Sequence, residues 1–276
     1  MKVTDETIKE LEGISNEIRK NIVKQVHSAK SGHPGGSLSI ADILTVLYFN
    51  QMHIDPKDPN NENRDRFVLS KGHASSAYYA VLAERGYFDK KELEGFRKLG
   101  SNLQGHPDMK HVPGVDMSTG SLGQGLSAAN GMALASKLDS RGYRVYCLLG
   151  DGEIQEGQVW EAMMTASHYK LDNLCIIIDN NNLQIDGKVS DVMSIYPLDK
   201  KLESFGFEVL TVEGNNIDEL ITVFEKAKTI KEKPTAIIAK TIKGKGVSYM
   251  ENEAGWHGKA PNDEEYEIAM KELSNN

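Results

Sequence analysis

Asp151 lies between Gly150 and Gly152, directly after the apolar run YRVYCLL. A carboxylate at the end of a buried strand needs a partner, because burying an unpaired charge is very costly. Asn181 follows a second apolar run, NLCIIID, and offers an amide oxygen. Magnesium in proteins is commonly held by a few such oxygens together with phosphate groups and water. The two loops therefore predict a metal-diphosphate site, in which a backbone carbonyl near Leu183 adds a third protein oxygen and the glycines let the backbone approach a phosphate.

Each loop alone has a simpler interpretation. GDG is a common turn and NNN is a common polar loop. The functional interpretation depends on their joint placement at the ends of two strands that one helix separates. A right-handed crossover would bring both loops to the same edge of a parallel sheet, which is where ligands bind in open α/β sheets.

The elements that must position these loops follow from the hydrophobic pattern. Helical patterns cover residues 4–30, 38–50, 72–88, 121–138, 154–170, 195–205 and 217–230, and strand patterns cover 66–70, 143–149, 174–178, 207–212 and 235–240. Asp89 and Glu92 resemble a capping box that opens a further helix over 90–100, and residues 100–120 form a long loop. Apolar strands that alternate with helices are typical of a parallel sheet covered on both faces. We expect one doubly wound α/β domain over residues 1–276.

Composition narrows the class of protein. The 276 residues are 39% hydrophobic and 26% charged, which is typical of a globular protein with a large core. A net charge of −8 argues against nucleic acid or an anionic membrane as the main partner, and we find neither a signal peptide nor a membrane span. We expect a cytoplasmic protein in which Cys147 and Cys175 are buried and free.

Several motifs then resemble those of a known family. Gly150-Asp151-Gly152, followed after 27 residues by Asn180-Asn181, is similar to the thiamine diphosphate signature. Other segments are similar to transketolase and stand in that family's order: SGHPGGSLS at 31–39, SKGHASSAYYA at 70–80, GHP at 105–107, PGVDMSTGSLGQGLSAANGMA at 113–133, GDGEIQEG at 150–157 and WHG at 256–258. The resemblance covers nearly the whole chain.

The resemblance implies roles for individual residues. Asp151, Asn181 and the Leu183 carbonyl would bind Mg²⁺, or another divalent cation such as Ca²⁺ or Mn²⁺, on thiamine diphosphate, and Gly152 would approach the diphosphate. The other implied cofactor contacts are His73 and the loop Gly120, Ser121 and Leu122. His33, His73, His106 and His257 would line the substrate channel as catalytic residues. Histidine suits this place, because ketol transfer moves protons near neutral pH, whereas we interpret the histidines at 27, 53, 111 and 168 as surface or structural groups.

The chain also departs from the family pattern. A full transketolase is more than twice this long and carries a pyrimidine-binding domain, with the glutamate that activates the cofactor, and a C-terminal domain. The resemblance is therefore to the N-terminal subunit of a split transketolase, which would form a heterotetramer with a C-terminal partner subunit and act on sugar phosphates. Ser121 replaces a proline of the common single-chain form, which leaves the sugar preference open.

Three alternatives stay open on the sequence. The chain could serve another thiamine-dependent transferase, such as a deoxysugar-phosphate synthase or an enzyme with an unusual acceptor. It could be a non-catalytic cofactor-binding module, or, less in keeping with its motifs, half of an NAD-dependent dehydrogenase, although GSLGQG lacks the order and the preceding strand of a dinucleotide fingerprint.

The remaining charged residues receive weaker predictions. Glu156 matches a family position at the subunit interface, and we interpret Glu153 and Glu161 as ordinary helix residues. KTIKGKGV at 240–247 is as consistent with a solvated loop as with a phosphate contact.

Overall fold

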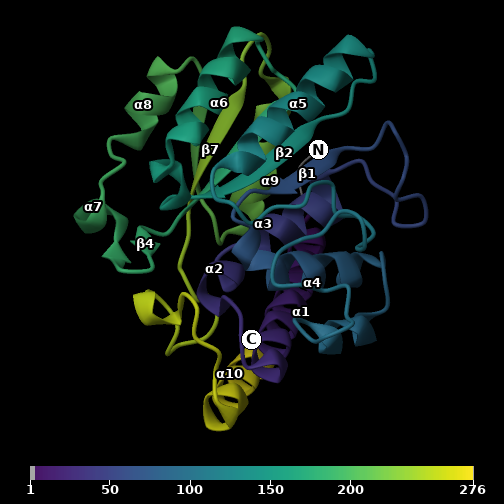
Figure 1. Ribbon diagram of the computed structural model, residues 1–276, viewed down its shortest axis with the longest axis vertical. Helices are drawn as coiled ribbons and strands as arrows, with labels where there is room; N and C mark the ends of the chain where they lie inside the picture. The colour runs from purple at the N-terminus through teal and green to yellow at the C-terminus, as the bar shows by residue number, and fades with distance from the viewer. Residues whose placement is uncertain (1–3, 276) are drawn as a thin grey trace.

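The computed structural model describes residues 4–275 and is built around a five-stranded parallel sheet in the order β1-β2-β3-β7-β6. Its strands are β1 (Arg66–Leu69), β2 (Val145–Gly150), β3 (Leu174–Asn180), β7 (Thr235–Lys240) and β6 (Glu208–Glu213). This confirms the parallel sheet with helices around it (Figure 1). The predicted strands all occur. The apolar runs of β2, β3 and β7 are buried on both faces, whereas the edge strand β6 is partly exposed on one face.

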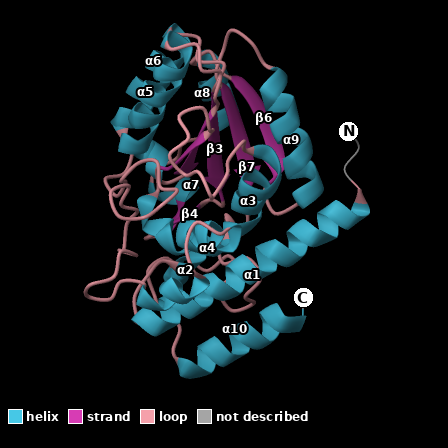
Figure 2. Ribbon diagram, turned by 90° about the vertical axis from the view of Figure 1, so that its right-hand side faces the viewer, coloured by secondary structure: helices cyan, strands magenta, loops and turns pink. Residues whose placement is uncertain are grey.

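Successive residues of each central strand enter different cores. Val145, Cys147 and Leu149 of β2 pack in one cluster, whereas Tyr146 and Leu148 pack in the other. The first cluster is covered by α5 (Gln124–Leu138), α6 (Gly157–His168) and α8 (Leu198–Ser204). The second is covered by α1 (Asp5–Ala29), α3 (Ala41–Val46), α4 (Ser75–Arg85) and α9 (Ile217–Thr229), so that helices flank both faces in Figure 2. Both cysteines are buried and free, as predicted.

Helix α1 is the longest helix and lies beside α10 (Asp263–Asn275), the last element described (Figure 2). Thr4 caps α1 by accepting a hydrogen bond from the N–H of Thr7. The sequence pattern predicted α1 and α9 closely, because both carry a continuous apolar stripe. It did not predict α10. No helix within residues 4–275 is long and apolar enough to span a bilayer.

Other boundaries differ from the prediction. Residues 38–50 are not one helix: α2 (Pro34–Leu38), α3 and a π-helical turn η1 (Leu47–Gln51) follow one another. Predicted helices 72–88, 121–138 and 154–170 begin later, as α4, α5 and α6, after short turns that include η2 (Gly72–Ala74) and η4 (Glu153–Gln155). The residues lost from these helices belong to the loops at the sheet edge. The predicted start of each of these helices was wrong, because buried polar contacts such as those of Glu153 fix the loops in another conformation.

The segment after Asp89 is a short 3-10 helix, η3 (Lys90–Gly95), and not the predicted helix over 90–100. Asp89 does cap it, accepting from the N–H of Lys91 at 2.9 Å. Beyond β3 the chain forms a small hairpin, β4 (Leu183–Gln184) with β5 (Gly187–Lys188), and the turn α7 (Val189–Val192). A short 3-10 turn, η5 (Ala254–Trp256), precedes His257.

Candidate functional site

The carboxyl ends of β2 and β3 lie next to each other. Gly150 is the register partner of Asp179, and the N–H of Asp151 donates to the Asp179 carbonyl at 3.2 Å. A cavity of about 570 Å³ opens at this edge. It is lined by His33, Gly36, Lys71, His73, His106, Gly120, Leu122, Gly150, Asp151, Gly152, Glu153, Gln155, Glu156, Asp179, Asn181, Leu183, Gln184, Ile185, Lys243 and His257. Of the residues expected to act in catalysis or to bind the cofactor or metal, Ser121 alone lies outside this lining, in a neighbouring hollow with His106.

Asp151 is 2% exposed. Its carboxylate accepts from the N–H of Gly152 at 2.8 Å, from the N–H of Asn182 at 2.5 Å and from the Asn180 amide at 3.2 Å. No lysine, arginine or histidine within residues 4–275 forms an ion pair with it. Burial, and next the nearby charge of Asp179, raise the pKa of Asp151 to about 6. A cation beside this carboxylate would relieve both effects.

Asp179 organises the opposite wall. Its side chain accepts from Lys71 and Ser39 at 2.7 Å each, from the Asn181 amide at 3.1 Å, and from the Thr241 hydroxyl. The Asn181 amide oxygen faces its own loop and accepts from the N–H of Leu183 at 3.0 Å. Asp179 thus sets the orientation of Asn181. The sequence pattern placed Asp179 at the strand end but indicated no role for it.

Two buried lysines also face the cavity, and the sequence indicated no role for one of them, Lys71. Lys71 is 2% exposed and donates to Asp179 and to the Gly36 carbonyl. Lys243, also 2% exposed, lies 3.4 Å from the Leu183 carbonyl oxygen and 3.1 Å from His257 Nδ1. Burial, and next the charge of Lys71, lower the pKa of Lys243 to about 8. Of the two interpretations of 240–247, the solvated loop is wrong for Lys243.

The four histidines singled out in the sequence all line the cavity. The ring centroids of His33, His73 and His257 are 5.1 to 5.4 Å apart. His106 is more exposed and lies against Gly120, where a Cβ would be 3.2 Å from its ring. Burial, followed by nearby cations, lowers the pKa of all four, to about 4 for His33 and about 3 for His257. The rings are therefore neutral at neutral pH.

Glu153 is not an ordinary helix residue, contrary to the sequence interpretation. It is 3% exposed, and its carboxylate accepts from the Ser70 hydroxyl at 2.5 Å and from the N–H groups of Gly123 and Gly150 at 3.0 Å each. It therefore joins the ends of β1 and β2 to the loop before α5. Glu161 is exposed on α6, as predicted, and Glu156 lines the exposed rim of the cavity.

The two glycines around Asp151 differ. A Cβ on Gly152 would lie 3.1 Å from Gln184 Cβ, so the hairpin approaches this glycine closely. A Cβ on Gly150 would lie 3.6 Å from Lys71 Cδ, an ordinary contact. Neither glycine has a positive φ. These contacts are within the protein, so the predicted approach of the two glycines to a phosphate stays a prediction.

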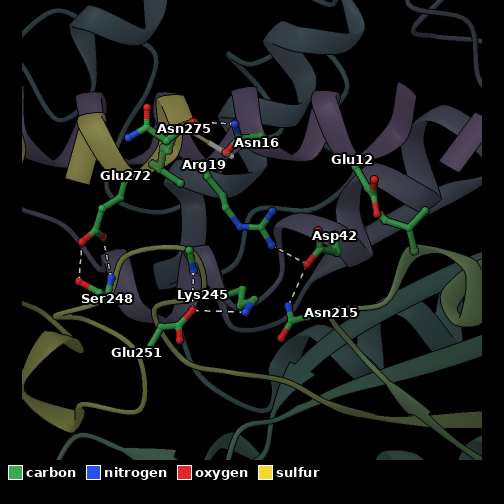
Figure 3. Close-up of a pocket in the computed structure, with 13 residues that line it drawn as sticks. Glu12, Asn16, Arg19, Asp42, Asn215, Lys245, Ser248, Glu251, Glu272 and Asn275 are labelled. Carbon is green, nitrogen blue, oxygen red and sulfur yellow. Dashed lines mark hydrogen bonds and ion pairs between the residues drawn. The ribbon is translucent and has the colours of Figure 1, made fainter. Parts of the chain in front are cut away.

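Another cavity, of about 720 Å³, lies between α1, α10 and the loops after β6 and β7 (Figure 3). Its polar groups largely bind one another: Arg19 pairs with Asp42, Asp42 accepts from Asn215 at 2.9 Å, and Glu251 lies 3.4 Å from Lys245. The first two contacts join α1 to α3 and to the loop after β6. We assign the chemistry to the smaller cavity, which is lined by the buried Asp151 carboxylate and the four histidines.

The donor set of the smaller cavity fits a hard cation. Within residues 4–275 no three His, Cys, Asp or Glu side chains gather as a metal cluster. Asp151, Asn181 and Leu183 instead offer a carboxylate, an amide and a backbone carbonyl oxygen, which are the ligand types that magnesium accepts when phosphate and water complete the shell. The adjacent lysines suit an anionic group such as a diphosphate.

Residues 11–276 match the family model described as "Transketolase, thiamine diphosphate binding domain". The chain is 44% identical over 267 residues to one of the subunits of apulose-4-phosphate transketolase from Phocaeicola vulgatus, covering 97% of this chain and 95% of that protein. It is 44% identical over 264 residues to a 6-deoxy-6-sulfo-D-fructose transketolase subunit of a Clostridium species, covering 96% of each chain. Human transketolase is 47% identical over 261 residues, which are 94% of this chain and 41% of the human protein.

Solved transketolase structures have the same fold as this chain. Transketolase from Campylobacter jejuni superimposes with a TM-score of 0.91 at 38% identity, over 97% of this chain and 43% of that one. A Pichia stipitis transketolase in complex with sedoheptulose 7-phosphate also gives 0.91, at 32% identity, over 96% of this chain and 40% of that one. The chain therefore spans nearly the full length of some relatives and less than half of others.

Proposed function

The chain belongs to the transketolase family, in which it represents the thiamine diphosphate-binding domain, and from this premise we propose that it is the N-terminal subunit of a two-chain transketolase. The reaction transfers a two-carbon ketol unit from a ketose phosphate to an aldose phosphate. One observation carries the proposal: the buried carboxylate of Asp151, two buried lysines and four neutral histidines face one cavity. All of residues 1–276 then form a single diphosphate-binding domain.

The proposed metal site uses Asp151, Asn181 and the Leu183 carbonyl to bind Mg²⁺ or a similar divalent cation. Its support is the buried carboxylate of Asp151, which lacks a cationic partner among the described residues and has a pKa raised to about 6. Gly152 and Lys243, which line the same cavity, would contact the diphosphate. His73 and the loop from Gly120 to Leu122 would contact the rest of the cofactor.

The histidines would act on the sugar. Thiamine diphosphate, when bound, supplies the carbon nucleophile and the electron sink for the two-carbon unit. His33, His73, His106 and His257 are neutral at neutral pH, so each ring has one N–H donor and one acceptor nitrogen. An N–H can donate to a hydroxyl or carbonyl oxygen of the sugar, and a free acceptor nitrogen can accept from a sugar hydroxyl. Their partial burial limits the access of water to those oxygens.

A second subunit would complete the site. The relatives from Phocaeicola vulgatus and Clostridium are named as transketolase subunits, and the chain matches nearly their whole length. Leu122 and Ile185 line the cavity and yet are 38% and 66% exposed, as expected for apolar groups that a partner covers. We propose a C-terminal partner that carries the pyrimidine-binding domain and the activating glutamate, in a cytoplasmic heterotetramer.

The test is to combine the purified chain with the product of the adjacent reading frame, provided that this encodes the missing half, with thiamine diphosphate and Mg²⁺. Transfer from xylulose 5-phosphate to ribose 5-phosphate is followed, and a panel of other ketose and aldose phosphates extends the assay. The panel includes apulose 4-phosphate and 6-deoxy-6-sulfofructose, because relatives are named for them. Absence of transfer with every donor and acceptor, in a complex that binds the cofactor, would contradict the proposal.

A further inference from the structure

Arg97 contacts His33 from outside the cavity. One guanidinium nitrogen, Nη1, donates to the Ser31 hydroxyl at 2.8 Å, and the other, Nη2, lies 3.3 Å from His33 Nδ1. The backbone fixes where this side chain starts: Arg97 has φ +57° and its N–H donates to the Leu103 carbonyl at 2.8 Å. The guanidinium also passes so close to Gly105 that a Cβ there would lie 3.0 Å from Arg97 Cζ. Arg97 is thus held from three sides.

The chemistry of arginine decides the direction of the hydrogen bond to His33. A guanidinium carries donors only and keeps its charge in proteins. The facing atom, Nδ1 of His33, must therefore be an unprotonated acceptor. In a neutral imidazole the proton then lies on Nε2.

His33 is neutral under ordinary conditions. Burial lowers its pKa to about 4, and the charge of Arg97 contributes next, followed by His106, Lys243 and Lys71. Within residues 4–275 no hydrogen bond is made by Nε2 of His33, whose ring lines the cavity beside His73 and His257. The ring atom of His33 that can bind a ligand is therefore Nε2, which carries a hydrogen and donates.

We propose that Arg97 is a positioning residue that fixes His33 in the tautomer protonated at Nε2, so that His33 presents a hydrogen-bond donor to a ligand oxygen. The identity of that oxygen, a hydroxyl or carbonyl of the sugar, rests on the proposed function. The tautomer itself does not. In this arrangement His33 polarises or orients an oxygen, and proton acceptance falls to another histidine of the cavity.

The test is nitrogen NMR of the full chain labelled with ¹⁵N, in which long-range proton-nitrogen correlations distinguish a protonated from an unprotonated ring nitrogen. A His33→Gln spectrum assigns the signals. We expect the wild-type His33 ring to be protonated at Nε2 and the Arg97→Met variant to show both tautomers, with the two nitrogen shifts moved toward each other. His257 is an internal control, since its Nδ1 faces Lys243 and not Arg97.

Lys98→Met is the matched variant, because it removes a neighbouring positive charge from an exposed side chain. It is expected to keep the wild-type pattern. A wild-type ring protonated at Nδ1, or an Arg97→Met ring unchanged from wild type, would overturn the inference. If Arg97→Met does not fold, the wild-type spectrum alone decides. The measurement needs no cofactor, partner or sugar, so failure of the proposed function would leave its result intact.

Discussion

Replacing Glu153 by alanine should destabilise the chain far more than replacing Glu161, although the two acids look alike in the sequence. Glu153→Ala removes the acceptor of three donors, the Ser70 hydroxyl and the N–H groups of Gly123 and Gly150. Each buried donor left unsatisfied costs about 1–3 kcal/mol. Part of this is offset, because burial raises the pKa of Glu153 and so makes its carboxylate costly to hold. We expect a net loss of about 3–5 kcal/mol in the free energy of unfolding.

The assay is urea unfolding of the full chain followed by circular dichroism, with Glu161→Ala as the matched control. Glu161 is exposed on α6, and its removal should change the free energy of unfolding by no more than about 0.5 kcal/mol. Glu153→Gln keeps one acceptor oxygen and should lie between the two. If Glu153→Ala and Glu161→Ala were equally stable, Glu153 would not join the loops of the site, and the reasoning would be refuted.

Two further predictions concern the histidines and glycines of the cavity. The folded-state pKa of His33 is about 4, below its ordinary 6.5, so the folded chain binds fewer protons than the unfolded chain. The stability contributed by the neutral ring is therefore present above about pH 6.5 and lost as pH falls toward 4. His33→Gln should lose less stability than wild type between about pH 7.5 and about pH 5, and equal losses for the two proteins in urea unfolding would contradict this. Gly152→Ala should lower the free energy of unfolding by about 1–2 kcal/mol, because its Cβ crowds Gln184. Gly150→Ala is the control, since its Cβ meets only ordinary contacts. Equal effects of the two substitutions in thermal unfolding would count against the close approach of Gln184 to Gly152.

The sequence predicted the parts of the fold that repeat a simple pattern. The strands around Asp151 and Asn181 are apolar throughout, and the crossover rule then placed their ends together, as the register of Gly150 with Asp179 confirms. The long helix α1 was predicted equally well, because it carries a continuous apolar stripe. In contrast, the hydrophobic pattern did not show where α5 and α6 begin. Gly123, directly before α5, has a φ of +82° and donates its N–H to the buried Glu153, so the helix does not extend over the preceding loop.

The sequence singled out Asp151 and the four histidines that line the cavity, but it indicated no role for the buried Lys71. Asp151 and the histidines stand beside glycines in recognisable motifs. Lys71 stands in one of the quoted motifs, yet nothing in SKGHASSAYYA shows that its side chain is buried against Asp179. That pairing joins residues 108 positions apart, and local sequence patterns carry no information about such a contact. Asp179, next to the last residue of β3, was the one available signal, since a buried carboxylate near a strand end requires a partner.

The central claim is that a divalent cation bound by Asp151 and Asn181 holds a diphosphate in the cavity. Its most direct test is calorimetric titration of thiamine diphosphate into the complex of the chain with the proposed partner subunit, with and without Mg²⁺, for wild type, Asp151→Ala and the exposed control Glu161→Ala. We predict that binding by wild type and by Glu161→Ala requires Mg²⁺, and that Asp151→Ala loses this dependence together with about 10-fold or more of its affinity, as expected for the loss of at least about 1.4 kcal/mol. Equal Mg²⁺-dependent affinity in a folded Asp151→Ala complex would contradict the claim.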